Sequence, residues 1–221
     1  MLKRRDFSAV LAVSALSGPP GLASAQVGAP VEGKQFIRLG QTLPTAPAKI
    51  EVVEFFWYGC PHCFVFDPVL EAWVKGLPAD VSFRRIHVGF NAMIKLHQKL
   101  FFALEAMGKE AEVHTAIFNA FHRERLELND EDAIVALVGK LGVDRAKFKD
   151  AFNSFGVQSK CLQASKLSEN FRIDGVPALG VGGKFWTSPS MAGTRGQAEI
   201  VLGQQAVAVA DHLIKLVRAK A

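Results

Sequence analysis

The spacing of apolar residues predicts two strand-rich segments separated by a helical one. A short strand is expected near Gln35–Leu39, followed by a stronger one over Lys49–Trp57. The second strand has a nearly continuous apolar run, which suits a central strand buried on both faces. A helix should then begin at Cys60 and end near Lys75, and the alternating stretch Val81–Val88 should form the next strand. Strand, helix and strand within this distance indicate a βαβ unit, with residue 60 at the carboxyl end of its first strand.

The apolar period then changes from that of strands to that of helices. Residues from about Ala92 to Phe171 read as several helices, and Asp130 and Asp144 are placed to cap two of them. Strand patterns return afterwards at Pro177–Val181 and Lys184–Thr187, with a Gly-Gly turn between them. The last predicted element is an amphipathic helix over about 196–218. We therefore expect an α/β domain formed by residues 26–90 and 172–221, interrupted by a helical insertion at 91–171.

The first 25 residues read as a cleaved export signal. Lys3, Arg4 and Arg5 precede an apolar core at residues 7–16, and Ala23-Ser24-Ala25 gives a small-x-small cleavage site. This apolar core is too short to span a bilayer. The two adjacent arginines also resemble a twin-arginine signal, so the general secretory and twin-arginine routes both stay open. Either route leads across the inner membrane of a bacterium into the oxidising periplasm.

Charge and cysteine content narrow the possible functions. The formal net charge is +5 over 221 residues, and the basic residues are scattered rather than clustered, which argues against nucleic-acid binding. Three cysteines are too few for a disulfide-dense scaffold. Two of them, Cys60 and Cys63, lie three positions apart, whereas Cys161 stands alone.

The pair Cys60 and Cys63 has three possible roles. A structural zinc site would need a second cysteine pair or two suitably spaced histidines, and the sequence offers neither, so we expect no metal. A purely structural disulfide gains stability mainly from the loop that it closes, and this loop is very short. The third role, a reactive dithiol, accounts for the residues between the cysteines as well.

A helix that begins at these cysteines would make Cys60 the more reactive one. Pro61 at the first helical position wastes no hydrogen-bond donor, and the free N–H groups of the first turn can reach the Cys60 sulfur. The positive end of the helix dipole and His62 further favour the Cys60 thiolate. Cys63, one turn inside, should keep an ordinary or raised pKa. We therefore predict that Cys60 attacks or is attacked, that Cys63 resolves, and that the disulfide form is oxidising.

The segment Phe55-Phe56-x-Tyr58-x-Cys60-Pro61-His62-Cys63, together with the distant Gly175-Val176-Pro177, resembles the DsbA family of bacterial thiol:disulfide oxidases. This family is itself a standard example of a low-pKa cysteine and an oxidising disulfide, so the agreement in sign adds no independent support. The resemblance covers nearly all of the chain after residue 25. It implies a thioredoxin fold with an inserted all-helical domain, and a monomer without a bound cofactor.

The resemblance also implies an activity and partners. The Cys60–Cys63 disulfide would be donated to reduced, newly exported proteins through a mixed-disulfide intermediate, and an inner-membrane, quinone-linked DsbB-like oxidase would restore it. A disulfide isomerase or reductase of the same fold stays open, as does a non-catalytic binding module with a structural disulfide. A general oxidase and one dedicated to a few clients both stay open.

Further site residues follow from the same resemblance. Val176 and Pro177 would form a cis-proline loop that faces the cysteines, tunes their redox behaviour and contacts substrate. Glu54 would be a buried acid that shuttles the Cys63 proton through water; otherwise it is a solvent-facing or salt-bridged strand residue. Lys95 is a candidate for its charged partner. Cys161 falls on an apolar helical stripe and is expected to be a buried, inert thiol, with a regulatory or intermolecular disulfide as the alternative.

Overall fold

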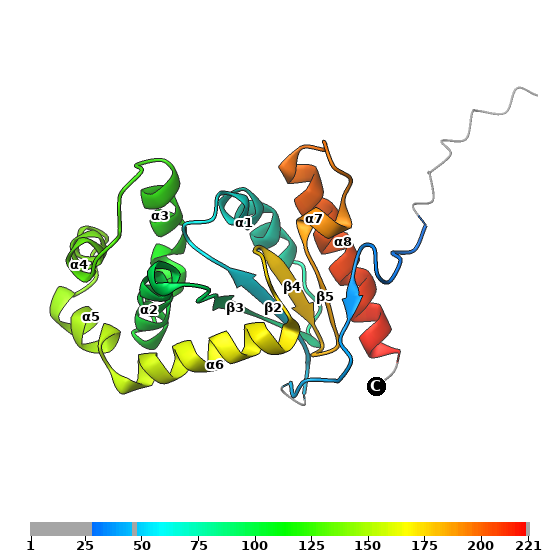
Figure 1. The fold of residues 1–221 in the computed structure, drawn as a ribbon, viewed down its shortest axis with the longest axis horizontal. Helices are drawn as coiled ribbons and strands as arrows, with labels where there is room; N and C mark the ends of the chain where they lie inside the picture. Colours follow the sequence, from blue (N-terminus) through cyan, green and yellow to red (C-terminus); the bar gives the residue numbers. More distant parts are fainter. Residues whose placement is uncertain (1–27, 46–47, 220–221) are drawn as a thin grey trace, which may run out of the picture.

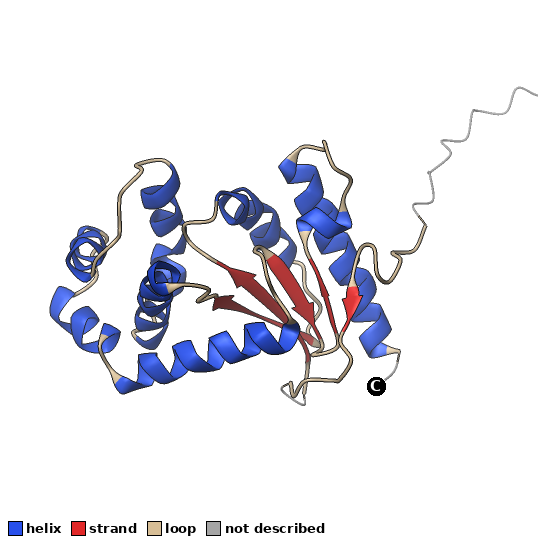
Figure 2. Ribbon diagram, viewed as in Figure 1, coloured by secondary structure: helices blue, strands red, loops and turns tan. Residues whose placement is uncertain are grey.

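The computed structural model describes residues 28–45 and 48–219 (Figure 1). The predicted export signal, residues 1–25, lies outside this part of the chain. Between β3 (Val81–His87) and β4 (Ala178–Val181), the chain forms a group of helices at one end of the molecule, while the sheet and the last helix lie at the other (Figures 1 and 2).

Five strands form one sheet in the described part of the chain, in the order β1-β5-β4-β2-β3. The remaining strands are β1 (Ile37–Arg38), β2 (Ile50–Phe56) and β5 (Phe185–Thr187). β2 pairs in parallel with β3 and antiparallel with β4, so it is an interior strand of the sheet, as its apolar run predicted. Gly182 and Gly183, both with positive φ, make the tight β4–β5 turn. The predicted strands are therefore confirmed, each somewhat shorter than its sequence pattern.

Eight helices accompany the sheet among the described residues. They are α1 (Pro61–Val74), α2 (Ala92–Ala106), α3 (Glu110–His122), α4 (Glu131–Lys140), α5 (Arg145–Phe152), α6 (Phe155–Phe171), α7 (Pro189–Ala192) and α8 (Glu199–Arg218). Asp130 and Asp144 cap α4 and α5 through side-chain hydrogen bonds, as predicted. The short helix α7 was not anticipated, because four residues are too few to show a period.

The interior strand β2 contributes side chains to two apolar clusters. Val52 faces one apolar cluster, which includes Phe66 and Leu70 of α1 and the buried side of α8. Val53 and Phe55 face a second cluster, built largely from α2 to α6. Alternate residues of one strand thus hold both halves together. Helix α8 is long and apolar enough by composition to cross a membrane, but it packs on α1 and the sheet, as a core helix does.

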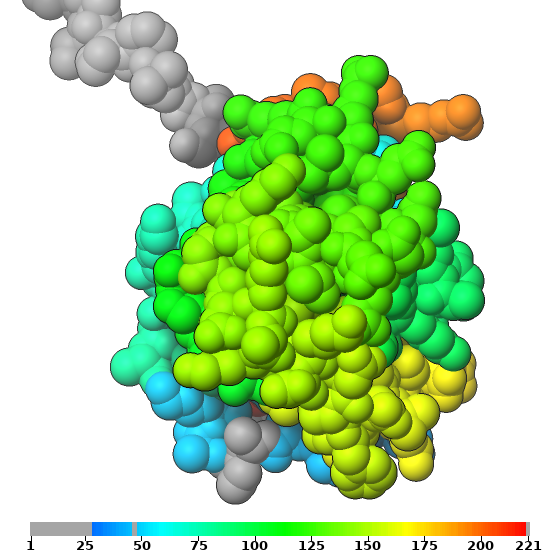
Figure 3. Space-filling model, turned by 90° about the vertical axis from the view of Figure 1, so that its left-hand side faces the viewer, coloured from blue at the N-terminus to red at the C-terminus, as the bar shows by residue number. Residues whose placement is uncertain are grey.

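The inserted helices place a second layer of structure over the end of the sheet where β2 and β3 finish. The space-filling view from that end consists largely of these helices (Figure 3). Helix α2 packs on α5 and α6, and α3 reaches α1. As a consequence, side chains of α3 lie within reach of the segment that joins β2 to α1.

Candidate active site

The two close cysteines lie where β2 passes into α1, and both are free thiols in the structure. Cys60 is the N-cap residue of α1 and Pro61 is its first residue, as predicted. The backbone N–H of Cys63 donates to Cys60 Sγ at 3.4 Å. Cys60 is 6% exposed and Cys63 is fully buried. An incoming sulfur can therefore approach Cys60, while Cys63 is shielded behind it.

The surroundings separate the acidities of the two thiols. A hydrogen bond from the Cys63 side chain, with help from the backbone N–H groups of Cys63 and His62 and from the charge of His62, lowers the pKa of Cys60 to about 6 against the opposing effect of burial. Burial, followed by the neighbouring Cys60, raises the pKa of Cys63 well above its usual range. At neutral pH, Cys60 is mainly thiolate and Cys63 is a thiol.

The loop before β4 faces the cysteines. The Val176–Pro177 peptide bond is cis. In its thiol form Cys60 donates to the backbone oxygen of Val176 at 3.4 Å, a contact between residues 116 positions apart. The structure thus brings together the two motifs that were separate in the sequence.

A cavity of about 470 Å³ opens beside this loop. Its lining includes His62, Val176, Pro177, Trp186, Met191 and Leu202. His62 lies at its rim, where its Nδ1 is 3.0 Å from a carboxylate oxygen of Glu199 at the start of α8. Sequence reasoning missed Glu199, since nothing local relates it to a histidine 137 positions away.

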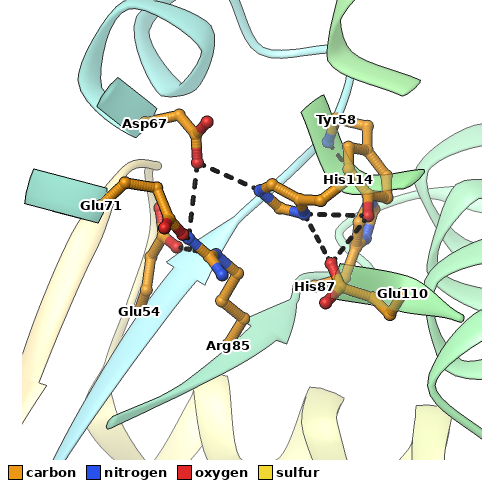
Figure 4. A network of polar contacts seen from close by, with 8 residues as sticks. All are labelled: Glu54, Tyr58, Asp67, Glu71, Arg85, His87, Glu110 and His114. Carbon is orange, nitrogen blue, oxygen red and sulfur yellow. Dashed lines mark hydrogen bonds and ion pairs between the residues drawn. The ribbon is translucent and has the colours of Figure 1, made fainter. Parts of the chain in front are cut away.

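Glu54 lies inside the protein, in a network of charged groups between the sheet and α1 (Figure 4). It is 1% exposed, and Arg85 Nε donates to its Oε2 at 2.9 Å. Burial raises the pKa of Glu54 to about 7, and the charge of Arg85 opposes this rise. The same guanidinium reaches Asp67 at 3.4 Å and also pairs with Glu71.

The prediction that Lys95 partners Glu54 is wrong. Lys95 is exposed on α2, whereas Arg85 is the register partner of Glu54 on the adjacent parallel strand. Register neighbours on one face of a sheet lie close enough for a long side chain to pair directly. The cation therefore comes from the neighbouring strand and not from the insertion.

Two histidines that sequence reasoning passed over belong to the same network. His114 of α3 lies between Asp67 and Glu110, with ring nitrogens 3.1 Å and 2.5 Å from their carboxylate oxygens. Burial disfavours the imidazolium, but the hydrogen bonds to Asp67 and Glu110 outweigh it and raise the pKa of His114 to about 9. Burial lowers the pKa of His87 to about 3, so this ring is neutral. His87 Nε2 accepts from the backbone N–H of Tyr58 and thereby supports the turn before the cysteines.

Two other expectations concern metals and Cys161. Across residues 28–45 and 48–219, no group of three or more His, Cys, Asp or Glu side chains is arranged to hold a metal ion. Cys161 is only partly buried and lines a second cavity, so the expectation of a buried thiol is correct only in part. Burial raises the pKa of Cys161 to about 11, which leaves it protonated and weakly nucleophilic at neutral pH.

A βαβ unit with an asymmetric dithiol at its helix N-terminus, faced by a cis-proline loop, defines a thioredoxin-fold thiol:disulfide oxidoreductase. Comparison with known proteins agrees. A family described as DSBA-like thioredoxin domain matches residues 91–197. The thiol:disulfide interchange protein DsbA of Burkholderia cepacia is 42% identical over 203 residues, covering 90% of this chain and 92% of that protein. The one from Pseudomonas aeruginosa PAO1 is 36% identical over 216 residues, covering 97% of each.

Solved structures give the same result. The crystal structure of Pseudomonas aeruginosa DsbA superimposes with a TM-score of 0.80 at 37% identity, covering 86% of this chain and 95% of that one. DsbA from Xylella fastidiosa gives a TM-score of 0.77 at 26% identity, covering 87% and 100%. The chain belongs to the DsbA family. The expected thioredoxin fold and thiol:disulfide oxidoreductase activity are thereby confirmed.

Proposed function

We propose that this oxidoreductase works as an oxidase in the periplasm and donates the Cys60–Cys63 disulfide to reduced, newly exported proteins. The observation that carries this direction is the unequal acidity of the two thiols. A stabilised Cys60 thiolate stabilises the reduced enzyme, and this makes the disulfide form a stronger oxidant. The basic residues at the start of the chain and the small residues at 23–25 are typical of an export signal, which supports a periplasmic location.

The transfer consists of two exchanges. A client thiolate attacks Cys60 Sγ, the Cys60–Cys63 bond breaks, and the Cys63 sulfur leaves with the bonding electron pair. A second client thiolate then attacks the client sulfur of the mixed disulfide, and Cys60 leaves as a thiolate. Two electrons pass from the client to the enzyme, so that the client gains a disulfide and the enzyme becomes a dithiol. The low pKa of Cys60 favours its departure in the second step.

Glu54 serves the proton balance of the first exchange. The Cys63 sulfur leaves as a thiolate, and its raised pKa requires that it take up a proton. Glu54, whose pKa of about 7 lets it give or accept a proton at neutral pH, lies close enough for its charge to act on Cys63. A water molecule between them would carry the proton, in the opposite direction when the enzyme is reoxidised.

Clients would lie across the loop at Val176-Pro177 and the adjoining cavity. The apolar side chains there, Trp186, Met191 and Leu202, suit contacts with many unfolded sequences. An inner-membrane DsbB-like oxidase linked to quinone would accept the two electrons, so the enzyme itself needs no bound cofactor. We further assign residues 26–90 and 172–221 to the thioredoxin-like domain of a monomer and 91–171 to its helical insertion.

The deciding experiment equilibrates the purified protein with mixtures of reduced and oxidised glutathione and measures its reduction potential. An oxidase should be substantially more oxidising than the glutathione couple. In parallel, the oxidised protein is mixed with a reduced, unfolded protein, and disulfide formation in that client is followed by loss of free thiols. A strongly reducing potential would show a reductase instead. An isomerase would rearrange incorrect disulfides in a client faster than it forms new ones.

A further inference from the structure

His114 connects the inserted helices to the charged network around Glu54. Its Nε2 faces Asp67 Oδ1 at 3.1 Å, and its Nδ1 faces Glu110 Oε1 at 2.5 Å. Because carboxylates accept but do not donate, two such neighbours require a proton on each ring nitrogen. The ring is therefore an imidazolium, and it is only 4% exposed. A charge buried this deeply is tolerated only where it is paired.

The balance of charge in the network shows what this imidazolium contributes. Four carboxyl groups, Glu54, Asp67, Glu71 and Glu110, share two cations, Arg85 and His114. Asp67 Oδ1 is contacted by both cations, and the contact to His114 is the shorter, at 3.1 Å against 3.4 Å. Arg85 in turn lies nearer to Glu54, at 2.9 Å, and to Glu71 than to Asp67. Asp67 is thus neutralised mainly by His114, so the guanidinium serves Glu54 and Glu71 and is drawn less toward Asp67.

We propose that His114 is a positioning residue of the redox site: by neutralising Asp67, it keeps Asp67 from drawing the Arg85 guanidinium away from Glu54 and so keeps Glu54 able to exchange a proton with Cys63. The proposal rests on the role given to Glu54 above. It assigns to α3, a helix of the insertion, a direct electrostatic part in the chemistry of the thioredoxin-like half.

The charged and titratable groups of the network come from every element packed against His114, and Glu71 of α1 is the partner of Arg85 on its outer side. Asp67 comes from α1, Glu54 from β2, Arg85 and His87 from β3, Tyr58 from the β2–α1 segment, and Glu110 from α3 itself. Two of them carry no charge at neutral pH, because burial raises the pKa of Tyr58 and lowers that of His87. The hydroxyl of Tyr58 donates to Glu110 and fixes that carboxylate against the ring. A cavity between α1 and α3 that is lined by Asp67, Arg85 and His114 lets solvent reach this side of the network.

Substituting His114 should change Glu54 in a defined direction. In His114→Gln, the positive charge is lost and Asp67 keeps Arg85 as its remaining cation. Both effects withdraw positive charge from Glu54, so its titration midpoint should rise by about half a pH unit or more. His114→Lys restores a cation and should bring the midpoint back. Asp67→Asn removes the competitor for Arg85 and should move the midpoint downward.

The measurement is a carboxyl carbon NMR titration of the reduced protein, with the Glu54 signal assigned by its loss in Glu54→Gln. His97→Gln is the matched control, because it removes an equally buried imidazole that bonds Leu128 but is neutral, its pKa being lowered by burial. It should leave the Glu54 midpoint unchanged. An unchanged or lowered midpoint in His114→Gln would overturn the proposal. If His114→Gln does not fold, Asp67→Asn decides, and a midpoint that does not fall refutes the inference.

The exchange assay with a reduced client separates this proposal from the proposed function. Failure of the wild-type protein to oxidise the client refutes the oxidase, while the titration still shows whether His114 sets the proton affinity of Glu54. Conversely, if the wild-type protein oxidises the client but the Glu54 titration midpoint is the same in His114→Gln, only the positioning role is refuted.

Discussion

The low pKa of Cys60 should make the stability of the reduced protein depend on pH in a way that the oxidised protein does not share. The folded pKa of about 6 lies below the ordinary thiol value of 9.0. A group whose pKa is lowered on folding stabilises the folded state fully above its unfolded pKa, and this contribution is lost as the pH falls through the folded pKa. The reduced protein should therefore gain stability relative to the oxidised one as pH rises from 5 to 8.

The magnitude follows from the two pKa values. A pH of 7 lies about one unit above the pKa of the folded Cys60 thiol, while the thiol of the unfolded chain is still protonated. This difference stabilises the folded reduced protein by about 1.4 kcal/mol. Solvent screening at the rim of the site would reduce this toward about 1 kcal/mol. Below pH 8 the raised pKa of Cys63 adds little, since that thiol is then protonated in both folded and unfolded chains. Glu54 and His114 are present in both redox forms and largely cancel in the difference.

Urea unfolding of the oxidised and the reduced protein, followed by tryptophan fluorescence at several pH values, gives the difference in free energy of unfolding directly. Ultraviolet absorbance of the thiolate provides an independent titration of Cys60, with a midpoint expected near pH 6. A stability difference that stays flat or shrinks between pH 5 and 8 would refute the assigned thiolate stabilisation. Reduced Cys60→Ser, which has no thiolate at this position, should lose the pH-dependent gain.

Other consequences can be tested with single substitutions. His62→Pro removes both the charge and the backbone N–H that favour the Cys60 thiolate, so the Cys60 pKa should rise and the protein become less oxidising; His62→Ala keeps the N–H and should show a smaller change in the same thiolate titration. Glu54→Gln should slow protonation of Cys63. In stopped-flow measurements, the dependence of the client oxidation rate on pH should then lose its inflection near pH 7. An inflection that persists would contradict the proton transfer by Glu54. Cys161 should react slowly with iodoacetamide at pH 7 in the oxidised protein, and Cys161→Ala should leave the client oxidation rate unchanged; rapid labelling would contradict the raised pKa.

The local features of this site could be read from the sequence because they depend on neighbours along the chain. The proline after Cys60 marks the helix start, and the first-turn N–H groups that stabilise the Cys60 thiolate come from His62 and Cys63. The apolar run of β2 likewise showed a strand buried on both faces. The facing loop at Val176 was placed by resemblance alone, since no local pattern connects it with Cys60.

The features that were missed depend mainly on partners distant in sequence. Choosing Arg85 over Lys95 as the partner of Glu54 required the strand register, which pattern reading does not supply. His114 looked like one of several unpaired histidines, because its carboxylate partners are Glu110 on its own helix and Asp67 on another. An i, i+4 pair of Glu and His on an apolar helix was the available signal.

The contact between Cys60 and Val176 also bears on how the protein is made. Synthesis proceeds from the N-terminus, so the cysteines emerge well before the loop that faces them and before β4, which pairs with β2 through Val52–Val181. Contacts of such long sequence separation form late in folding. A nascent chain that ends before residue 176 would carry both thiols but lack the loop and the strands β4 and β5. The loop that faces Cys60 thus becomes available only when about four-fifths of this chain has been synthesised.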